Sequence, residues 1–237
     1  MKGSSRFNKK SHIVIFGYRG HETRQLIEEI LADENRSKRM LVFCSSKAEE
    51  NPFPDMDVDF IRGELTSDDV LERACVAYAD KILIHGHDDH QTMAIAVAVF
   101  NINKEAHIVA YLESLDIARL LRGMNPKISC IEPFYVPMMV QEMQDPGVID
   151  VIKLLFSNLV GEVIYRVDIP DGEYSVPFET LFKLFKEKYG ATVIGVIDSG
   201  PIINPPSNFV VKAGMALVLI AAKRPTKVNW EEMCLRV

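Results

Sequence analysis

Residues 12–20, with the sequence HIVIFGYRG, decide the fold of this chain. The apolar run His12–Phe16 is followed by a glycine and then by Thr23–Leu31, where apolar residues recur at helical spacing. Such a short apolar run is typical of a strand buried on both faces, and the glycine directly after it indicates a tight turn. The stretch therefore predicts the first strand, turn and helix of a βαβ unit.

The same alternation of apolar runs and helical segments continues as far as Glu132. The further predicted strands are Met40–Cys44, Val58–Ile61, Lys81–Ile84, His107–Leu112 and Ser129–Ile131, and the further predicted helices are Asp68–Ala77, Gln91–Phe100 and Asp116–Leu121. Strands that alternate with helices are joined by right-handed crossovers into a parallel sheet. The sequence therefore predicts an α/β fold with a Rossmann-like, doubly wound parallel sheet.

Two apolar helices are predicted after Pro133, at Tyr135–Met143 and Val148–Leu159, separated by the turn Asp145-Pro146-Gly147. Their apolar residues cover most of the helix circumference, which is more than one face of a domain buries. We expect a second copy of the chain to cover this helix-turn-helix crossover. Packing between the two halves of its own chain is the alternative.

The last third of the chain predicts a small α+β lobe. Its strands are expected at Glu162–Ile169, Ala191–Ile197, Asn208–Val211 and Met215–Ala221, and its helix carries an apolar face of Phe178, Leu181, Phe182, Phe185 and Tyr189, with Gly190 as the C-cap. The predicted organisation is a linker at 1–10, the Rossmann-like N-lobe at 11–134, the crossover at 135–160, the C-terminal lobe at 161–225 and a tail at 226–237.

Composition excludes several classes of protein. The net charge of −6 and the pI of about 5.6 argue against nucleic acid as the partner, because that affinity comes from clustered Lys and Arg. The four cysteines lie far apart without a CxxC pair, which favours reduced thiols in a cytoplasmic protein. The best apolar runs, Met93–Phe100 and Met215–Ala222, are too short to span a bilayer, and the basic start Met1–Lys10 is not a secretory signal.

A dinucleotide-binding fold would carry G-x-G-x-x-G after its first strand. Here only Gly17 is in register, since Arg19 and Glu22 stand at the second and third glycine positions and Gly20 comes one place late. The second strand should end near an acid for the ribose, but Ser45 lies there instead. We therefore expect NAD binding to be weak or absent and the crevice to take a different ligand.

The string His85–His90, HGHDDH, matches the H-x-H-x-D-H metal signature of binuclear zinc hydrolases. That chemistry needs further ligands downstream, and the only later histidine is His107. The string follows a predicted strand, at the edge where open α/β sheets bind ligands, and the next strand brings Glu113 to the same edge. A helix cap by Asp88 or Asp89 with solvated histidines is one reading, and a divalent-cation or small-ligand site is the other.

These residues together resemble the RCK family, the regulators of potassium conductance found in prokaryotic channels and in Trk and Ktr transporters. The resemblance covers residues 11–222 and rests on the order of HIVIFGY at 12–18, RGELT at 62–66, Ala79-Asp80, Asp88-Asp89 with Thr92, YGATVIGV at 189–196, Asn204-Pro205 and KAGMAL at 212–217. In calcium-gated members, carboxylates stand at positions matching His85, Tyr111 and Glu113. Only Glu113 is an acid here, which favours a softer metal or another ligand over calcium.

The resemblance implies a cytoplasmic, ligand-sensing gating-ring domain and no enzyme. It implies homodimers that assemble into an octameric ring beneath a membrane-embedded potassium channel pore, without direct membrane insertion by this chain. The residues expected to bind the ligand are Gly17, Tyr18, Arg19, Gly20, Ser45, His85, Asp88, Tyr111 and Glu113, and those expected to hold a divalent cation are His85, His87, Asp88 and Glu113. Three alternatives stay open: a binuclear zinc hydrolase, an NAD-binding subunit of a Trk/Ktr-type transporter and a free-standing NAD(P)-dependent oxidoreductase.

Overall fold

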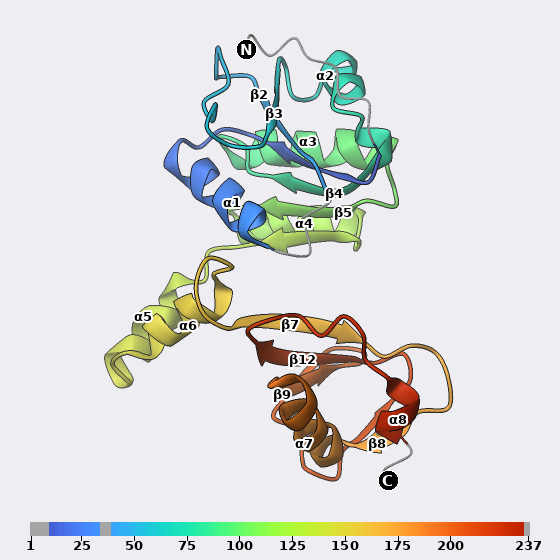
Figure 1. Cartoon of the computed structure of the whole chain (residues 1–237). Coiled ribbons are helices and arrows are strands. Elements are labelled where there is room, and N and C mark those ends of the chain that lie inside the picture. The colour runs from blue at the N-terminus through green and yellow to red at the C-terminus, as the bar shows by residue number, and fades with distance from the viewer. Residues whose placement is uncertain (1–9, 34–38, 235–237) are drawn as a thin grey trace. The chain divides into compact units, whose positions relative to one another are not determined.

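The computed structural model describes residues 10–33 and 39–234. The chain divides into two compact units, Met1–Met139 and Val140–Val237 (Figure 1). Most of the predicted linker at 1–10 and the end of the predicted tail at 226–237 lie outside the described residues. Within the described ranges, none of the helices has both the length and the apolar character needed to cross a membrane.

The first unit is built on a six-stranded parallel sheet with the strand order β3-β2-β1-β4-β5-β6. The strands are β1 (His12–Phe16), β2 (Leu41–Ser45), β3 (Asp59–Arg62), β4 (Ala79–Ile84), β5 (His107–Tyr111) and β6 (Ile128–Ile131). The order reverses between β1 and β4, as in doubly wound folds. The predicted Rossmann-like fold class is confirmed.

Helices cover both faces of this sheet. They are α1 (His21–Ala32), α2 (Asp68–Arg73), the 3-10 turn η2 (Val76–Tyr78), α3 (Asp89–Ile102) and α4 (Leu115–Met124). Alternate residues of β1 face opposite sides: Ile15 packs in one core with Ile27 of α1, and Phe16 in the other with Ile95 of α3. The sheet therefore lies between two apolar layers, and the ends of its strands lie outside these layers.

Two predictions for this unit were wrong in detail. The single helix predicted at Asp68–Ala77 is interrupted, because Cys75 adopts the left-handed conformation with a φ of 50° between α2 and η2. The strands were predicted to be buried on both faces, which holds for β1 and β2. The other four strands carry exposed residues, namely Asp59 and Arg62 of the edge strand β3, Lys81 of β4, His107 of β5 and Ile131 of the edge strand β6.

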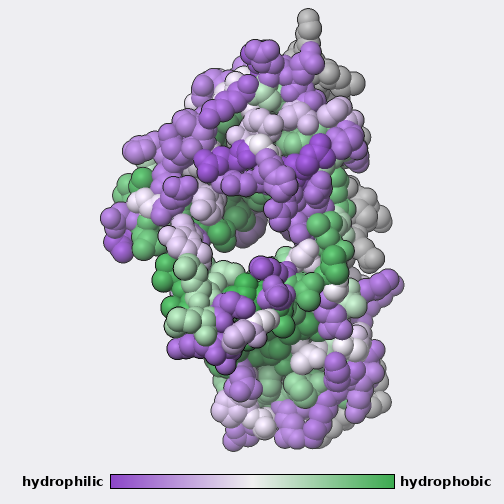
Figure 2. Space-filling view, turned by 90° about the vertical axis from the view of Figure 1, so that its left-hand side faces the viewer, coloured by the Kyte–Doolittle hydropathy of each residue, from purple (hydrophilic) through white to green (hydrophobic). Residues whose placement is uncertain are grey.

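The predicted helix-turn-helix is observed as α5 (Tyr135–Gln144) and α6 (Val148–Phe156). The Glu142 carboxylate accepts hydrogen bonds from the Gly147 and Ile149 amides, at 2.9 and 3.1 Å, which satisfies donors at the start of α6. Neither helix has a buried residue. Figure 2 views the chain from the side on which these helices lie in Figure 1 and shows apolar residues in green at the surface beside hydrophilic ones in purple.

The second unit is a small α+β structure. Its sheets are β10-β9-β12-β7 and β11-β8, formed by β7 (Val163–Asp168), β8 (Ser175–Pro177), β9 (Thr192–Ile197), β10 (Pro201–Ile203), β11 (Val210–Lys212) and β12 (Ala216–Ala221), with helices α7 (Phe178–Tyr189) and α8 (Trp230–Cys234). Gly190 is the left-handed C-cap of α7, as predicted. The buried face of α7 includes Leu184, whereas Phe182, predicted to be buried, is 40% exposed.

Candidate functional site

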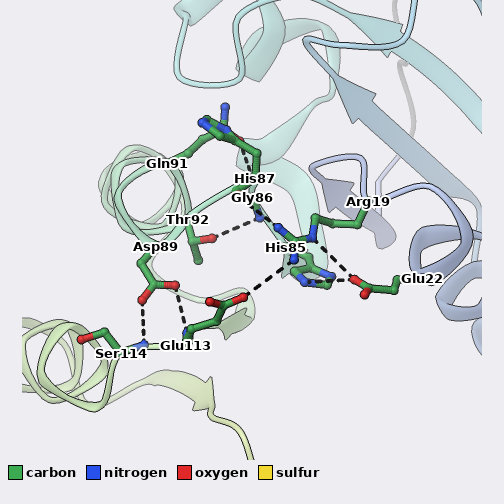
Figure 3. A network of polar contacts seen from close by, with 10 residues as sticks. All are labelled: Arg19, Glu22, His85, Gly86, His87, Asp89, Gln91, Thr92, Glu113 and Ser114. Atoms are coloured by element: carbon green, nitrogen blue, oxygen red, sulfur yellow. Dashed lines mark hydrogen bonds and ion pairs between the residues drawn. The ribbon is translucent and has the colours of Figure 1, made fainter.

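The candidate site lies where the carboxyl ends of β1, β4 and β5 meet beside the reversal of strand order. Three loops converge there: residues 17–20 after β1, residues 85–88 after β4 and residues 112–114 after β5. Figure 3 shows the side chains of Arg19, His85 and Glu113, one from each loop, directed toward one another. The sheet alone brings these segments together, since they are far apart in the sequence.

Gly17 allows the first two of these loops to touch. Its φ is +102°, and a Cβ at this position would lie 1.9 Å from the carbonyl oxygen of His85. The His85 amide donates to the Phe16 carbonyl at 2.8 Å, which continues the pairing of β1 with β4 past the strand ends. The first glycine of the degraded fingerprint is therefore required by the packing of the chain against itself.

Arg19, at the second glycine position, joins the three loops. Its Nη1 donates to the His87 carbonyl at 2.9 Å, and its Nη2 lies 3.8 Å from Glu113 Oε1 (Figure 3). Its Nε is 3.5 Å from Glu22 Oε2, at the first turn of α1. The guanidinium therefore contacts one group from each of the segments that follow β1, β4 and β5.

The charges around Arg19 disfavour a phosphate. Two carboxylates, Glu22 and Glu113, face one guanidinium, so the cluster carries an excess of negative charge. Glu22 also occupies the first turn of α1, where the helix dipole would otherwise attract an anion. A dinucleotide bound in the usual pose would have to displace Arg19 and place its pyrophosphate beside Glu22.

His85 forms the inner wall of the cluster. Its side chain is 16% exposed, its Nε2 lies 3.7 Å from Glu22 Oε2, and its ring packs edge-on against Tyr111 with centroids 4.8 Å apart. Among the described residues Nε2 has no hydrogen-bond partner. Burial, aided by the positive charge of Arg19, lowers the pKa of His85 against the opposing effect of Glu22 and Glu113. The neutral imidazole is therefore favoured.

The start of α3 is held by two aspartates with different roles. Asp88 caps the helix, since its Oδ1 accepts from the Gln91 amide at 2.8 Å, which confirms the predicted cap. The carboxylate of Asp89 accepts from the amides of Glu113 and Ser114, at 2.9 and 2.7 Å, and so fixes the loop after β5 (Figure 3). This bridge was not predicted, because the spacing from Asp89 to Glu113 carries no periodic signal.

Three of the predicted ligand-binding residues serve local structure. The ring of Tyr18 packs edge-on against Phe43 and Phe53, with centroids 6.1 and 6.0 Å apart. Gly20 precedes α1 with a φ of 61°, and the hydroxyl of the buried Ser45 accepts from the amides of Lys47 and Ala48. The structure therefore brings Arg19, His85, Tyr111 and Glu113 together and uses Tyr18, Gly20 and Ser45 to shape the loops around them.

The predicted metal set is divided between two places. His87 Nε2 lies 3.0 Å from Asp88 Oδ2, whereas His85 and Glu113 belong to the cluster around Arg19. Within the part of the chain that the structure describes, no group of three or more His, Cys, Asp or Glu side chains is arranged to hold a metal ion. Binding of a divalent cation by this set would therefore require the loops to rearrange.

Comparison with known proteins identifies the first unit. Residues 13–128 match the family model of the TrkA-N domain. This match confirms the family resemblance drawn from the sequence for this part of the chain. No curated protein sequence matches the chain significantly.

One of the solved structures that this chain resembles supports the fold. The human SLO3 gating ring superposes with a TM-score of 0.65 and 17% identity over 90% of this chain, which spans 44% of that chain. The GsuK channel bound to NAD gives a TM-score of 0.47 and 13% identity over 97% of this chain and 39% of that one. The TrkA-N domain of the inner membrane protein ybaL from Escherichia coli gives a TM-score of 0.48 and 16% identity over 59% of this chain and 98% of that one.

Proposed function

Since residues 13–128 form a TrkA-N domain, the N-lobe of the RCK family, we propose that this chain is the cytoplasmic ligand-sensing part of a gating ring that regulates a potassium channel. It couples ligand binding in the crevice to opening of the pore. The SLO3 gating ring, which has the same fold, is the relative that suggests the channel as partner.

The observation that carries this proposal is the position of Arg19 between three loops. A ligand that replaces Arg19 on Glu22 or Glu113 changes how the loops after β1, β4 and β5 are held together. Binding then alters the shape of the whole edge of the sheet. A ligand shifts a two-state equilibrium only through such a difference in affinity between the two shapes.

A regulatory role suits this crevice better than catalysis does. Its charged side chains are engaged with one another, and among those described no nucleophile is paired with a general base. The proposed ligand-binding residues remain Gly17, Tyr18, Arg19, Gly20, Ser45, His85, Asp88, Tyr111 and Glu113, with His85, His87, Asp88 and Glu113 as the candidate set for a divalent cation. Weak NAD binding stays a prediction, because it rests on Arg19 and Glu22 in the glycine positions.

Assembly is proposed to proceed through α5 and α6. Their exposed apolar side chains are Tyr135, Val136, Met139, Val140, Met143, Val151, Leu154 and Phe156. A monomer rarely leaves so many apolar side chains together in water. We infer a homodimer formed through these helices, and an octameric ring of such dimers on the cytoplasmic side of the pore.

The proposal is tested by single-channel recording of the parent channel with and without residues 11–237, across divalent cations and nucleotides. We expect deletion to alter the open probability and at least one ligand to change it in the intact protein. Glu113→Gln should shift that ligand's response, whereas Glu105→Gln, at an exposed site away from the crevice, should not. Unchanged open probability under all of these conditions would refute the regulatory role.

The TrkA-N match also supports a second candidate, a regulatory subunit of a Trk/Ktr-type potassium transporter. This candidate predicts a separate membrane subunit and potassium uptake rather than a single-channel current. Co-purification of the chain with a membrane protein encoded separately would favour the transporter, and a pore loop encoded upstream on the same chain would favour the channel.

A further inference from the structure

A cavity of about 670 Å³ adjoins the crevice at the ends of β5 and β6. It is lined by Tyr111, Glu113, Glu132, Pro133, Phe134, Tyr135 and Met138. Its size is within the range of small-molecule sites, which are mostly apolar with a few polar groups. All of its lining residues belong to the first unit.

The lining combines aromatic rings with carboxylates. Tyr111 comes from β5, and Phe134 and Tyr135 from the segment after β6, where they are 67% and 62% exposed. An aromatic ring attracts a cation through its negative face, and the attraction is strongest where the cation is poorly hydrated, as in alkylated ammonium groups. Carboxylates beside such rings add a direct charge interaction.

The two lining carboxylates differ in their availability. Glu132 is paired with Arg122, and its side chain is 24% exposed. Glu113 is 67% exposed and lies 3.8 Å from Arg19, a distance and exposure at which an ion pair is weak. Glu113 is therefore the carboxylate that a bound cation would share with Arg19.

Acidic side chains outnumber basic ones around the inner wall. Burial is the main cause that raises the pKa of the Tyr111 hydroxyl, and the charges of Glu113, Glu22 and Asp89 add to it while Arg19 opposes them. Three carboxylates and one guanidinium therefore act on this hydroxyl, and the net charge beside it is negative. The cavity thus combines an aromatic lining with an excess of carboxylates.

We propose that this cavity binds a small organic cation with an alkylated ammonium group, held against Tyr111 and Phe134 and neutralised by Glu113. The site shares Tyr111 and Glu113 with the proposed ligand-binding residues and so rests on the proposed function. Binding by the isolated chain is measured without a pore or a ring, so the two proposals can fail separately. Its position next to Arg19 would let such a ligand act on the same three loops.

The test is calorimetric titration of the full chain with choline and with 3,3-dimethylbutan-1-ol, which has the same shape without the charge. We expect choline to bind at least about tenfold more tightly than the neutral alcohol, as cation–π and charge attraction of this size imply. Equal affinity of the two compounds, or no heat from choline at millimolar concentration, would overturn the proposal.

Matched variants locate the site. Phe134→Leu keeps apolar bulk without the ring, and Glu113→Gln keeps the side-chain shape without the charge. Each should weaken choline binding severalfold. Tyr78→Leu removes a similarly exposed aromatic ring of the same unit, and Glu105→Gln removes an exposed carboxylate; neither should change the affinity. Unchanged affinity in both Phe134→Leu and Glu113→Gln would place binding elsewhere and contradict the proposal.

Two further measurements distinguish other possible occupants of the cavity. If calcium chloride binds and choline does not, the carboxylates form a metal site and the proposal is wrong. The titration is also run at two protein concentrations, monitored by light scattering, because α5 supplies Tyr135 and Met138. Loss of choline binding on dimerisation would identify a second copy of the chain as the occupant and would equally overturn the proposal.

Discussion

The Arg19 guanidinium donates a hydrogen bond of 2.9 Å to the carbonyl oxygen of His87, so the loop after β1 is tied to the loop after β4. A glycine at the same position would leave this space open for a ligand's pyrophosphate. The contact explains physically why a Rossmann-like crevice with intact strands need not bind a dinucleotide.

The first prediction concerns NADH. The wild-type chain should bind it weakly, because Arg19 fills the crevice and Glu22 repels the phosphates. The double variant Arg19→Gly/Glu22→Gly restores G-x-G-x-x-G and should tighten binding by about tenfold, or about 1.4 kcal/mol. Calorimetry of both proteins measures the difference. Micromolar affinity in the wild type, or no gain in the double variant, would contradict the expectation.

The second prediction compares two glycines. Gly17→Ala should lower the free energy of unfolding by about 3 kcal/mol or more, because its Cβ would meet the His85 carbonyl at 1.9 Å in a left-handed conformation. Gly20→Ala, which also has a positive φ but no atom within 4 Å of the new Cβ, should lose only about 1 kcal/mol. Urea denaturation measures both, and equal losses would show that the close approach is unimportant.

The third prediction concerns assembly. Val151 and Leu154 are 57% and 50% exposed on α6, and Leu155 beside them is half-buried. Burial of about 1,000 Å² of such surface at about 25 cal/mol/Å² favours a dimer, so Val151→Glu/Leu154→Glu should produce a monomer. Lys153→Glu changes a polar residue of the same helix, whose side chain is 67% exposed and paired with Asp150; this control should remain dimeric. Light scattering that finds a wild-type monomer at micromolar concentration would refute this assembly.

The fourth prediction is a pH dependence of stability. Burial lowers the pKa of His85 below its ordinary 6.5, so the unfolded chain binds the proton at a higher pH than the native chain does. Stability is therefore complete above about 6.5 and falls as the pH drops from there toward the lowered pKa. Burial and Arg19 lower the pKa, Glu22 and Glu113 oppose them, and Tyr111 packs against the ring.

Urea denaturation between pH 5 and 7.5 tests this pH dependence of stability. The variant His85→Gln should lose less stability over this window than the wild type. Because His12 also has a lowered pKa from burial, His12 contributes in both proteins, and the difference between them reports on His85 alone. Parallel curves for the two proteins would show that His85 does not titrate in this way.

The local pattern of the sequence determined the elements and their order. Short apolar runs at His12–Phe16 and at the five strand positions that follow it in the first unit are typical of a buried parallel sheet, because their length and β-branching disfavour helices. Caps were also predictable, because Asp88 accepts from the amide three residues ahead and the Gly190 amide donates to the carbonyl five residues back. These features depend on neighbours in the chain, which the sequence contains.

Features that depend on residues distant in the chain could not be predicted from the sequence. The choice of Leu184 over Phe182 on α7 depends on where the sheet lies beside the helix, and both residues fit an amphipathic stripe. The exposure of Asp59 and Arg62 follows from β3 being an edge strand, which is a property of the whole sheet.

The same distinction between local and distant neighbours applies to the candidate site. The sequence identified Arg19, Glu22, His85 and Glu113 as unusual residues at strand ends, because parallel strands bring their carboxyl ends to one edge. The bond from Arg19 to His87 and the bridge from Asp89 to the loop after β5 were decided only by the tertiary structure. Such contacts depend on distances of a few ångströms between separate loops, and those distances follow from strand order and packing rather than from any spacing along the chain.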